Sequence, residues 1–402
     1  MFDGSAVAET VGDTMRAALE ETTDIQGTVA PAFEAVREQF AALLAAEGSE
    51  LDVQVAAYHR GEKVVDLWAG PDTKADSIMG IYSASKGVSH LVVALLVQDG
   101  VLDLDQKVGH YWPQFAVEGK QDLLVRELLG HQAGLVGATH GFTMEELADD
   151  QLVAERLGAQ RPFWRPGRAT GYHALVMAAL SGELVRRATG RAVQEHFAER
   201  LQTPLKLDLH LGLPADQDDR FLNAQPMTAT PERLRELAAT TTAPASLSGI
   251  AFNRHHPRNR EVWELPNLPF VRSHGTASFG GVGTARGLAK LYSALVSPVN
   301  GGEPLLESAT ASSFGQIQSN GSDLVLRQPK AWAVGFHASS QTYPVLGAGA
   351  FGHSGAGGQQ ALVDPRNELS YAFLRRRFLI PDQADADHLR LLTALVTAAR
   401  RA

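Results

Sequence analysis

Cysteine is absent from the 402 residues, and this absence removes several classes of chemistry. A chain without thiols forms no disulfide bond, binds no metal through thiolates and uses no cysteine nucleophile. Positive charge is also scarce, because the formal net charge is −9. An acidic chain without a basic patch is not typical of proteins that bind nucleic acids. We therefore expect no nucleic-acid partner.

Long apolar runs are lacking as well. No stretch is long enough to span a bilayer. The first 24 residues, MFDGSAVAETVGDTMRAALEETTD, have neither the basic start nor the apolar run of a secretory signal. Hydrophobic residues at 44% and charged residues at 20% are ordinary for a soluble protein. We expect a cytoplasmic protein without a membrane partner, and a homo-oligomer is compatible with the sequence.

Strand patterns occur at both ends of the chain, and helix patterns occupy the middle. Residues 53–67 read as a hairpin that turns at Arg60-Gly61-Glu62, and AWAVGFH, QQALVDP and ELSYAFLRR read as strands near the C-terminus. Apolar spacing predicts flanking helices over 33–44 and 385–400. The expected fold is α+β, with a mainly antiparallel sheet, flanking helices and an inserted, mostly helical domain. The predicted parts are an N-terminal arm (1–27), a discontinuous sheet domain (28–82 and 280–402) and the helical domain (83–279).

The segment SIMGIYSASKGVSH, residues 77–90, places Ser83 three positions before Lys86. On a helix this spacing puts both side chains on one face. Residues 83–98 are almost wholly apolar after the first turns, which is typical of a buried helix. Burial lowers the pKa of a lysine and makes its neutral, basic form accessible, and a serine hydroxyl needs such a base to act as a nucleophile. Alternatively, Ser83 caps the helix and Lys86 is solvated.

Two further segments carry residues that could complete such a site. Tyr172 follows a Pro-Gly turn at the start of a predicted helix in WRPGRATGYHALVMAALSGELVRRATGR, where its phenol could relay a proton. His353, Ser354 and Gly355 precede a glycine run in FGHSGAGGQQALVDP, where the N–H groups of Ala356 and of the serine at 83 could form an oxyanion hole. Alternatively, the tyrosine packs on the core and the second segment is only a glycine-rich turn.

Taken together, these motifs resemble the serine hydrolases of the class C β-lactamase type, and most closely the family VIII carboxylesterases. The resemblance covers nearly the whole chain from about Ile25. Besides the serine-x-x-lysine motif, the tyrosine segment and His-x-Gly, it includes VVDLWAG, VRELLGHQAGL, PLKLDLHLGLP and GTARGLAKLYSAL. The resemblance implies a β-lactamase-like fold, with the active site between the sheet domain and the helical domain.

The resemblance also implies roles for individual residues. Ser83 would be the nucleophile of an acyl-serine intermediate, and Lys86 and Tyr172 would be its paired proton shuttles. The segment His353-Ser354-Gly355 would form the wall of the oxyanion site, which binds substrate with no cofactor and no metal. Penicillin-recognising relatives usually carry Tyr-x-Asn and Lys-Thr-Gly, whereas this chain has alanine at position 174 and histidine at 353. These departures favour small-molecule esters over β-lactams, and they predict a carboxylesterase that cleaves short-chain esters.

Other functions compete with this prediction. The same site could hydrolyse β-lactams or transfer acyl groups, and a non-catalytic penicillin-recognising protein could share the fold. In GHSGA, Ser354 could be the nucleophile of an α/β-hydrolase, but Ala356 stands where that motif has glycine, and fewer than fifty residues follow for the acid and histidine. A metal enzyme is disfavoured, since His255-His256 is the only adjacent histidine pair and no zinc-binding motif occurs.

Overall fold

The computed structural model describes residues 24–48, 51–379 and 381–402, and a nine-stranded sheet runs through it. The strand order is β1-β3-β2-β12-β11-β10-β9-β8-β7, and every neighbouring pair is antiparallel. The strands are β1 (Gln26–Val29), β2 (Val53–His59), β3 (Glu62–Ala69), β7 (Ile317–Ser322), β8 (Pro329–Ala333), β9 (His337–Ala338), β10 (Phe351–Gly355), β11 (Gln359–Asp364) and β12 (Leu369–Arg375).

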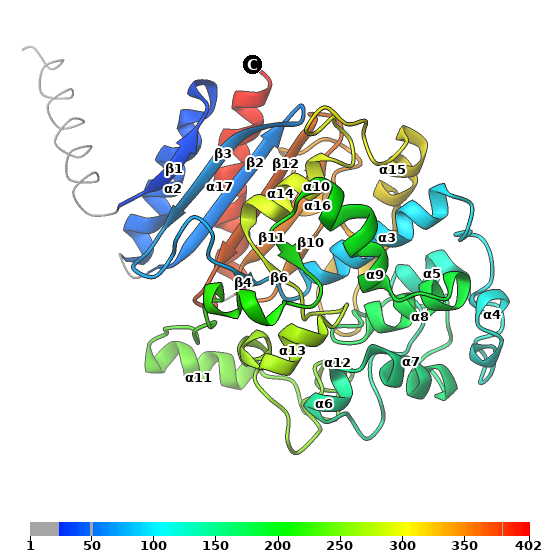
Figure 1. The fold of residues 1–402 in the computed structure, drawn as a ribbon. Helices are drawn as coiled ribbons and strands as arrows, with labels where there is room; N and C mark the ends of the chain where they lie inside the picture. Colours follow the sequence, from blue (N-terminus) through cyan, green and yellow to red (C-terminus); the bar gives the residue numbers. More distant parts are fainter. Residues whose placement is uncertain (1–23, 49–50, 380) are drawn as a thin grey trace, which may run out of the picture.

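The two ends of the chain meet in this sheet, because β12 pairs with β2 along its whole length. Figure 1 shows the N-terminal strands in blue beside the C-terminal strands in orange. The hairpin predicted over 53–67 is present as β2 and β3, and its turn uses positive φ angles at Arg60 and Gly61. The α+β fold with a mainly antiparallel sheet is confirmed.

Helices cover both faces of the sheet. On one face, α2 (Glu34–Glu47) packs against α17 (Pro381–Ala399), and their apolar side chains meet those of the inner strands. On the other face, α14 (Ala285–Ser293) contacts β2, β11 and β12, while α3 (Ala84–Gln98) contacts β10 and β11. The Thr284 hydroxyl accepts a hydrogen bond from the Gly287 N–H at the start of α14, as an N-cap does.

The middle of the chain is mostly helical, as Figure 1 shows in cyan and green. A small second sheet in the order β4-β6-β5 joins this part to the turn before α3, through β4 (Met79–Gly80), β6 (Val282–Gly283) and β5 (Leu209–His210). The other helices are α4 (Val108–Tyr111), α5 (Val125–Leu129), α6 (Met144–Leu147), α7 (Asp150–Ala159), α8 (Met177–Thr189), α9 (Val193–Phe197), α10 (Thr203–Leu205), α11 (Pro231–Thr240), α12 (Leu247–Ala251), α13 (Pro269–His274), α15 (Ser308–Gly315) and α16 (Ser339–Thr342). The domain boundaries at 82/83 and 279/280 stay a prediction.

The predicted N-terminal arm needs one correction. Gln26 and Gly27 do not belong to an arm but to the edge strand β1, which pairs with β3. Gly27 has φ +101°, and a Cβ atom there would lie 2.0 Å from the carbonyl oxygen of Asp66. A four-residue strand with a glycine has too little alternation to be recognised in the sequence. Residues 1–23 of the arm lie outside the described residues. Within the described ranges, no helix is long and apolar enough to cross a membrane.

Candidate active site

The turn before α3 presents Ser83. The residue before it, Tyr82, is buried and has φ +48°, a left-handed conformation that costs free energy in a residue with a side chain. The Tyr82 hydroxyl donates a hydrogen bond to the carbonyl oxygen of Trp263 at 3.0 Å, which helps to hold this conformation. Although Ser83 occupies the N-cap position, its hydroxyl makes no capping bond. The Ser83 hydroxyl is therefore not used to cap the helix, and the residue is partly exposed.

Lys86 is completely buried one turn into α3. Its Nζ atom lies 3.2 Å from Ser83 Oγ, 2.5 Å from the carbonyl oxygen of Ala174 and 2.8 Å from that of Ser278. Burial lowers the pKa of Lys86 well below its ordinary value. A neutral amine has two N–H groups, and each can donate a hydrogen bond to one of the two carbonyl oxygens. The lone pair of the amine then faces the serine hydroxyl.

Tyr172 completes the group around the serine. Its side chain hydrogen-bonds to that of Ser83, and Lys86 Nζ lies 5.1 Å from the centre of its ring. The ring stacks on Trp332 with centroids 5.1 Å apart and an interplanar angle of 13°. Burial raises the pKa of Tyr172, while the hydrogen bond with Ser83 acts in the opposite direction. The structure thus brings together the three side chains that the sequence selected, and the phenol is protonated at neutral pH.

Two buried histidines, His131 and His173, lie next to Tyr172. His131 Nδ1 accepts a hydrogen bond from the backbone N–H of His173, and the His131 ring lies 5.1 Å from the ring of Tyr172. His173 Nδ1 donates to the carbonyl of Gly171 at 2.8 Å, and its Nε2 accepts from the N–H of Leu135 at 3.1 Å. Burial lowers the pKa of His131 well below its usual range and that of His173 to about 3. Both rings are therefore neutral, and they add no charge beside the lysine.

The segment predicted as the oxyanion wall is the end of β10 and the start of the following turn. His353 is 1% exposed and its Nδ1 donates to the carbonyl of Ser354 at 2.7 Å, while its Nε2 has no partner within the described ranges. The backbone of Gly355 abuts the turn that presents the serine, since a Cβ atom on Gly355 would lie 2.3 Å from the carbonyl oxygen of Ile81. Ala356 follows in the turn, partly exposed. The role of this segment in binding an oxyanion stays a prediction.

Sequence reasoning missed several groups of the site. These are the strained Tyr82, the carbonyl of Ser278, the stacking partner Trp332 and the buried carboxylate of Asp323, which accepts the backbone N–H of Tyr172 at 3.1 Å. Backbone carbonyls carry no sequence signal, and Asp323 and Trp332 lie more than 150 positions from Tyr172. No local pattern could have associated them with it.

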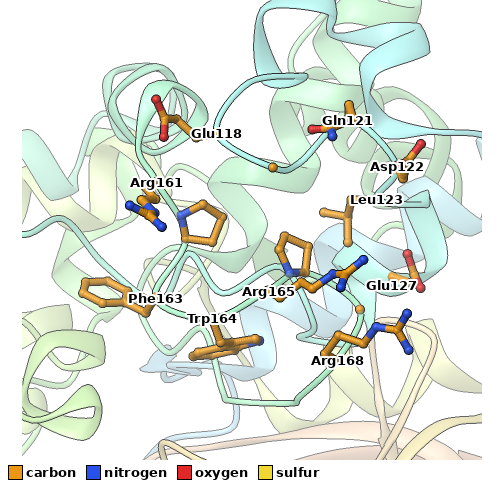
Figure 2. Close-up of a pocket in the computed structure, with 14 residues that line it drawn as sticks. Glu118, Gln121, Asp122, Leu123, Glu127, Arg161, Phe163, Trp164, Arg165 and Arg168 are labelled. Atoms are coloured by element: carbon orange, nitrogen blue, oxygen red, sulfur yellow. The ribbon is translucent and has the colours of Figure 1, made fainter.

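A hollow with a volume of about 850 Å³ is lined by residues from the ranges 118–127 and 161–168. Figure 2 shows it between the loop around Gln121 and the segment 161–168, with Trp164 below. The indole of Trp164 is also close to Gly171, where a Cβ atom would lie 2.6 Å from it. Ser83, Lys86 and Tyr172 do not line this hollow. Within the described residues, no group of three or more histidine, aspartate or glutamate side chains could hold a metal ion.

The site combines a serine whose hydroxyl does not cap its helix, a buried lysine one helical turn later and a tyrosine hydrogen-bonded to the serine. Together with the nine-stranded antiparallel sheet and the helical insertion, these groups define a serine hydrolase of the β-lactamase fold. A family model described as Beta-lactamase matches residues 35–395, and the chain belongs to this family.

Known relatives agree with this assignment. The esterase/beta-lactamase LipL of Mycobacterium tuberculosis is 32% identical over 348 residues, which cover 81% of this chain and 77% of that protein. EstA from Arthrobacter nitroguajacolicus Rue61a superposes with a TM-score of 0.86 at 35% identity, covering 94% of this chain and 99% of its own. A family VIII carboxylesterase gives 0.82 at 30% identity, with 93% and 100% covered. The resemblance predicted from the sequence motifs is confirmed.

Proposed function

We propose that the protein is a serine carboxylesterase that hydrolyses short-chain carboxylic esters through an acyl-serine intermediate. The observation that carries the proposal is the position of Lys86 Nζ, which two carbonyl oxygens and the Ser83 hydroxyl surround in a fully buried site. An amine held in this way is a base that is already oriented toward the hydroxyl it must activate. An unreactive serine would not need such an arrangement.

The proposed cycle begins when Ser83 Oγ attacks the ester carbonyl carbon and its proton passes to Lys86, with Tyr172 as a participant in the transfer. The negative oxygen of the tetrahedral intermediate is bound by the N–H groups of Ser83 and Ala356. Among the described residues, neither N–H group donates a backbone hydrogen bond in a turn, loop or cap. The C–O bond to the alcohol then breaks, and the protonated shuttle gives its proton to the departing alcohol. Water repeats the same steps on the acyl-enzyme and releases the acid.

Two positions near the serine favour esters over β-lactams. His353 occupies the place where penicillin-recognising relatives usually have a lysine, and its ring is neutral because burial lowers its pKa well below the usual range. It therefore offers no positive charge to the carboxylate of a β-lactam. Ala174 stands where those relatives have asparagine and offers no side-chain amide to the lactam substituent. The name of the family VIII carboxylesterase that superposes on this chain points in the same direction.

The experiment that tests the proposal is a substrate comparison with the purified protein. We expect hydrolysis of p-nitrophenyl acetate and butyrate at a rate well above that of longer esters and of a chromogenic cephalosporin. Hydrolysis of the cephalosporin at a higher kcat/KM than any ester would instead favour a β-lactamase, the second candidate, which the double name of LipL supports. Failure to cleave either class would contradict both functions.

A further inference from the structure

Asp323 is a buried carboxylate that the proposed cycle does not use. It lies in the turn between β7 and β8, and its residue is 1% exposed. The structure shows no ion pair for it within the described ranges. Its oxygen atoms are satisfied by N–H groups instead: Oδ1 accepts from the backbone of Tyr172, Val325 and Leu326 at 3.1, 2.9 and 2.8 Å, and Oδ2 accepts from the indole Nε1 of Trp332 at 3.1 Å.

This carboxylate therefore holds both members of the stacked aromatic pair. One oxygen fixes the backbone of Tyr172, and the other fixes the indole of Trp332, on which the ring of Tyr172 lies. A further hydrogen bond, from the Leu324 N–H to the carbonyl of Thr170 at 2.9 Å, joins the same two chain segments. Two hydrogen bonds thereby join the β7–β8 turn to the segment that carries Tyr172, and a third joins the turn to Trp332 in β8.

We infer that Asp323 is a positioning residue that sets the place of the Tyr172 hydroxyl at Ser83. The inference rests on the proposed function, since it assigns a task in the same proton transfer. The phenol oxygen is at the far end of a long side chain, so a small rotation at the backbone or a tilt of the stacking partner displaces it appreciably. A misplacement of about 1 Å in a reacting group can cost on the order of a hundredfold in rate.

The side chain must accept hydrogen bonds at both oxygens, and this requirement can be tested. A carboxylate only accepts hydrogen bonds, whereas an amide has one acceptor oxygen and one donor NH₂ group. In Asp323→Asn the amide oxygen can still accept hydrogen bonds from the three backbone N–H groups. The NH₂ group of the amide then faces the indole N–H of Trp332. Two donors in contact push the indole away from the place where it supports Tyr172.

The first experiment measures kcat and KM for a p-nitrophenyl ester in Asp323→Asn, with Asp364→Asn as the matched control. Asp364 is also buried and also accepts several N–H groups, from Gly347, Arg366 and Asn367, but it lies at the far end of β11 from the catalytic serine. We expect kcat to fall about ten- to a hundredfold in Asp323→Asn with KM within about threefold, and Asp364→Asn to lose thermal stability while kcat stays within about twofold. Equal losses of kcat in both variants, or an unchanged kcat in Asp323→Asn, would overturn the inference.

A second variant separates positioning from general destabilisation. Trp332→Phe keeps a stacking ring and removes the indole N–H, so the opposed donors of Asp323→Asn no longer meet. We expect Asp323→Asn to cost clearly less in the Trp332→Phe background than in the wild type, and additive losses would overturn the inference. Should Asp323→Asn fail to fold, Trp332→Phe alone is expected to lower kcat several-fold at unchanged KM, and wild-type kcat would overturn it.

A third readout does not depend on ester turnover. The rate at which a fluorophosphonate modifies Ser83 reports activation of the hydroxyl directly. Slow labelling in Asp323→Asn together with no ester hydrolysis by the wild type would reject the carboxylesterase and keep the positioning role. Labelling at the wild-type rate would reject the positioning role, whatever the result with esters.

Discussion

Two serines of this protein lie beside a possible base, and their surroundings differ in an instructive way. Ser83 Oγ is 3.2 Å from Lys86 Nζ, and Ser354 Oγ is 3.4 Å from His337 Nδ1. Both serines are partly exposed and both follow sequence patterns known from serine hydrolases. Proximity to a base therefore does not distinguish them.

What distinguishes them is how firmly the base is held and where the serine sits. Two carbonyl oxygens fix Lys86, whereas among the described residues no carboxylate forms an ion pair with His337. A catalytic histidine normally needs such a third group to orient its ring. Ser83 lies in a strained turn at the start of a buried helix, while Ser354 lies within the regular strand β10. The comparison teaches that an activated serine needs an oriented base and a turn that presents the hydroxyl.

The largest effect is expected from Ser83→Ala, which removes the attacking oxygen. We predict that kcat/KM for p-nitrophenyl butyrate falls by at least about a thousandfold while the circular dichroism spectrum is unchanged. A steady-state assay with freshly purified protein measures this. Turnover near the wild-type level would transfer the nucleophile role to Ser354.

Lys86→Ala removes the proposed base and should lower kcat by about a hundred- to ten-thousandfold, the usual contribution of general base catalysis. Lys120 provides a matched control because it is also buried, hydrogen-bonds to the carbonyl of Gln160 and lies over the ring of Phe115. Among the described residues, no hydroxyl group forms a hydrogen bond with Lys120 Nζ. Lys120→Met should reduce stability with little effect on kcat, and equal losses of activity in the two variants would show that burial of the lysine matters more than its position.

Tyr172→Phe keeps the ring stacked on Trp332 and removes only the hydroxyl that hydrogen-bonds to Ser83. We expect kcat to fall by about a hundredfold, because proton transfer to the leaving alcohol loses one of its two participants. Burst kinetics with a p-nitrophenyl ester would show which half of the cycle is slowed. Full activity would restrict the tyrosine to a packing role.

The dependence of kcat/KM on pH sharpens the comparison further. In the proposed cycle the neutral form of Lys86 is the base, so activity should fall as the pH decreases through the lowered pKa of this lysine and its Nζ becomes protonated. Replacing His337 by asparagine should leave this acidic limb in place. If Ser354 and His337 were the reacting pair, the same substitution would abolish activity instead.

Ser354→Ala should have the smallest effect, a loss of less than about tenfold in kcat/KM. The proposed role of this segment uses its backbone, and the Ser354 hydroxyl forms a long contact, 3.4 Å, with His337 Nδ1. The assay of the first prediction serves here as well. A loss as large as that of Ser83→Ala would contradict the account of the two serines.

The sequence predicted the parts of this molecule that depend on local pattern. The buried helix α3 could be read from its apolar run, and the spacing of Ser83 and Lys86 on it follows from helix geometry alone. The hairpin of β2 and β3 follows from alternation around a Gly turn. Tyr172 could be selected because it follows a Pro-Gly turn, but its contact with the serine depends on the family resemblance and not on any local rule.

What the sequence could not predict depends on contacts between distant segments. β10 contains two glycines and reads as a turn, yet it is a strand because β9 and β11 pair with it, and a Cβ atom on Gly352 would lie 2.2 Å from the carbonyl of Ala361. The left-handed conformation of Tyr82 is likewise imposed by its surroundings. The contact of Asp323 with the backbone of Tyr172 has no local signal, because the two residues are 151 positions apart.

The most direct measurement is mass spectrometry of the protein after reaction with a fluorophosphonate, which forms a covalent bond with an activated serine. The account predicts one modified peptide, carrying the label on Ser83, and no label after Lys86→Ala within the same reaction time. A label on Ser354 of the wild-type protein would contradict it.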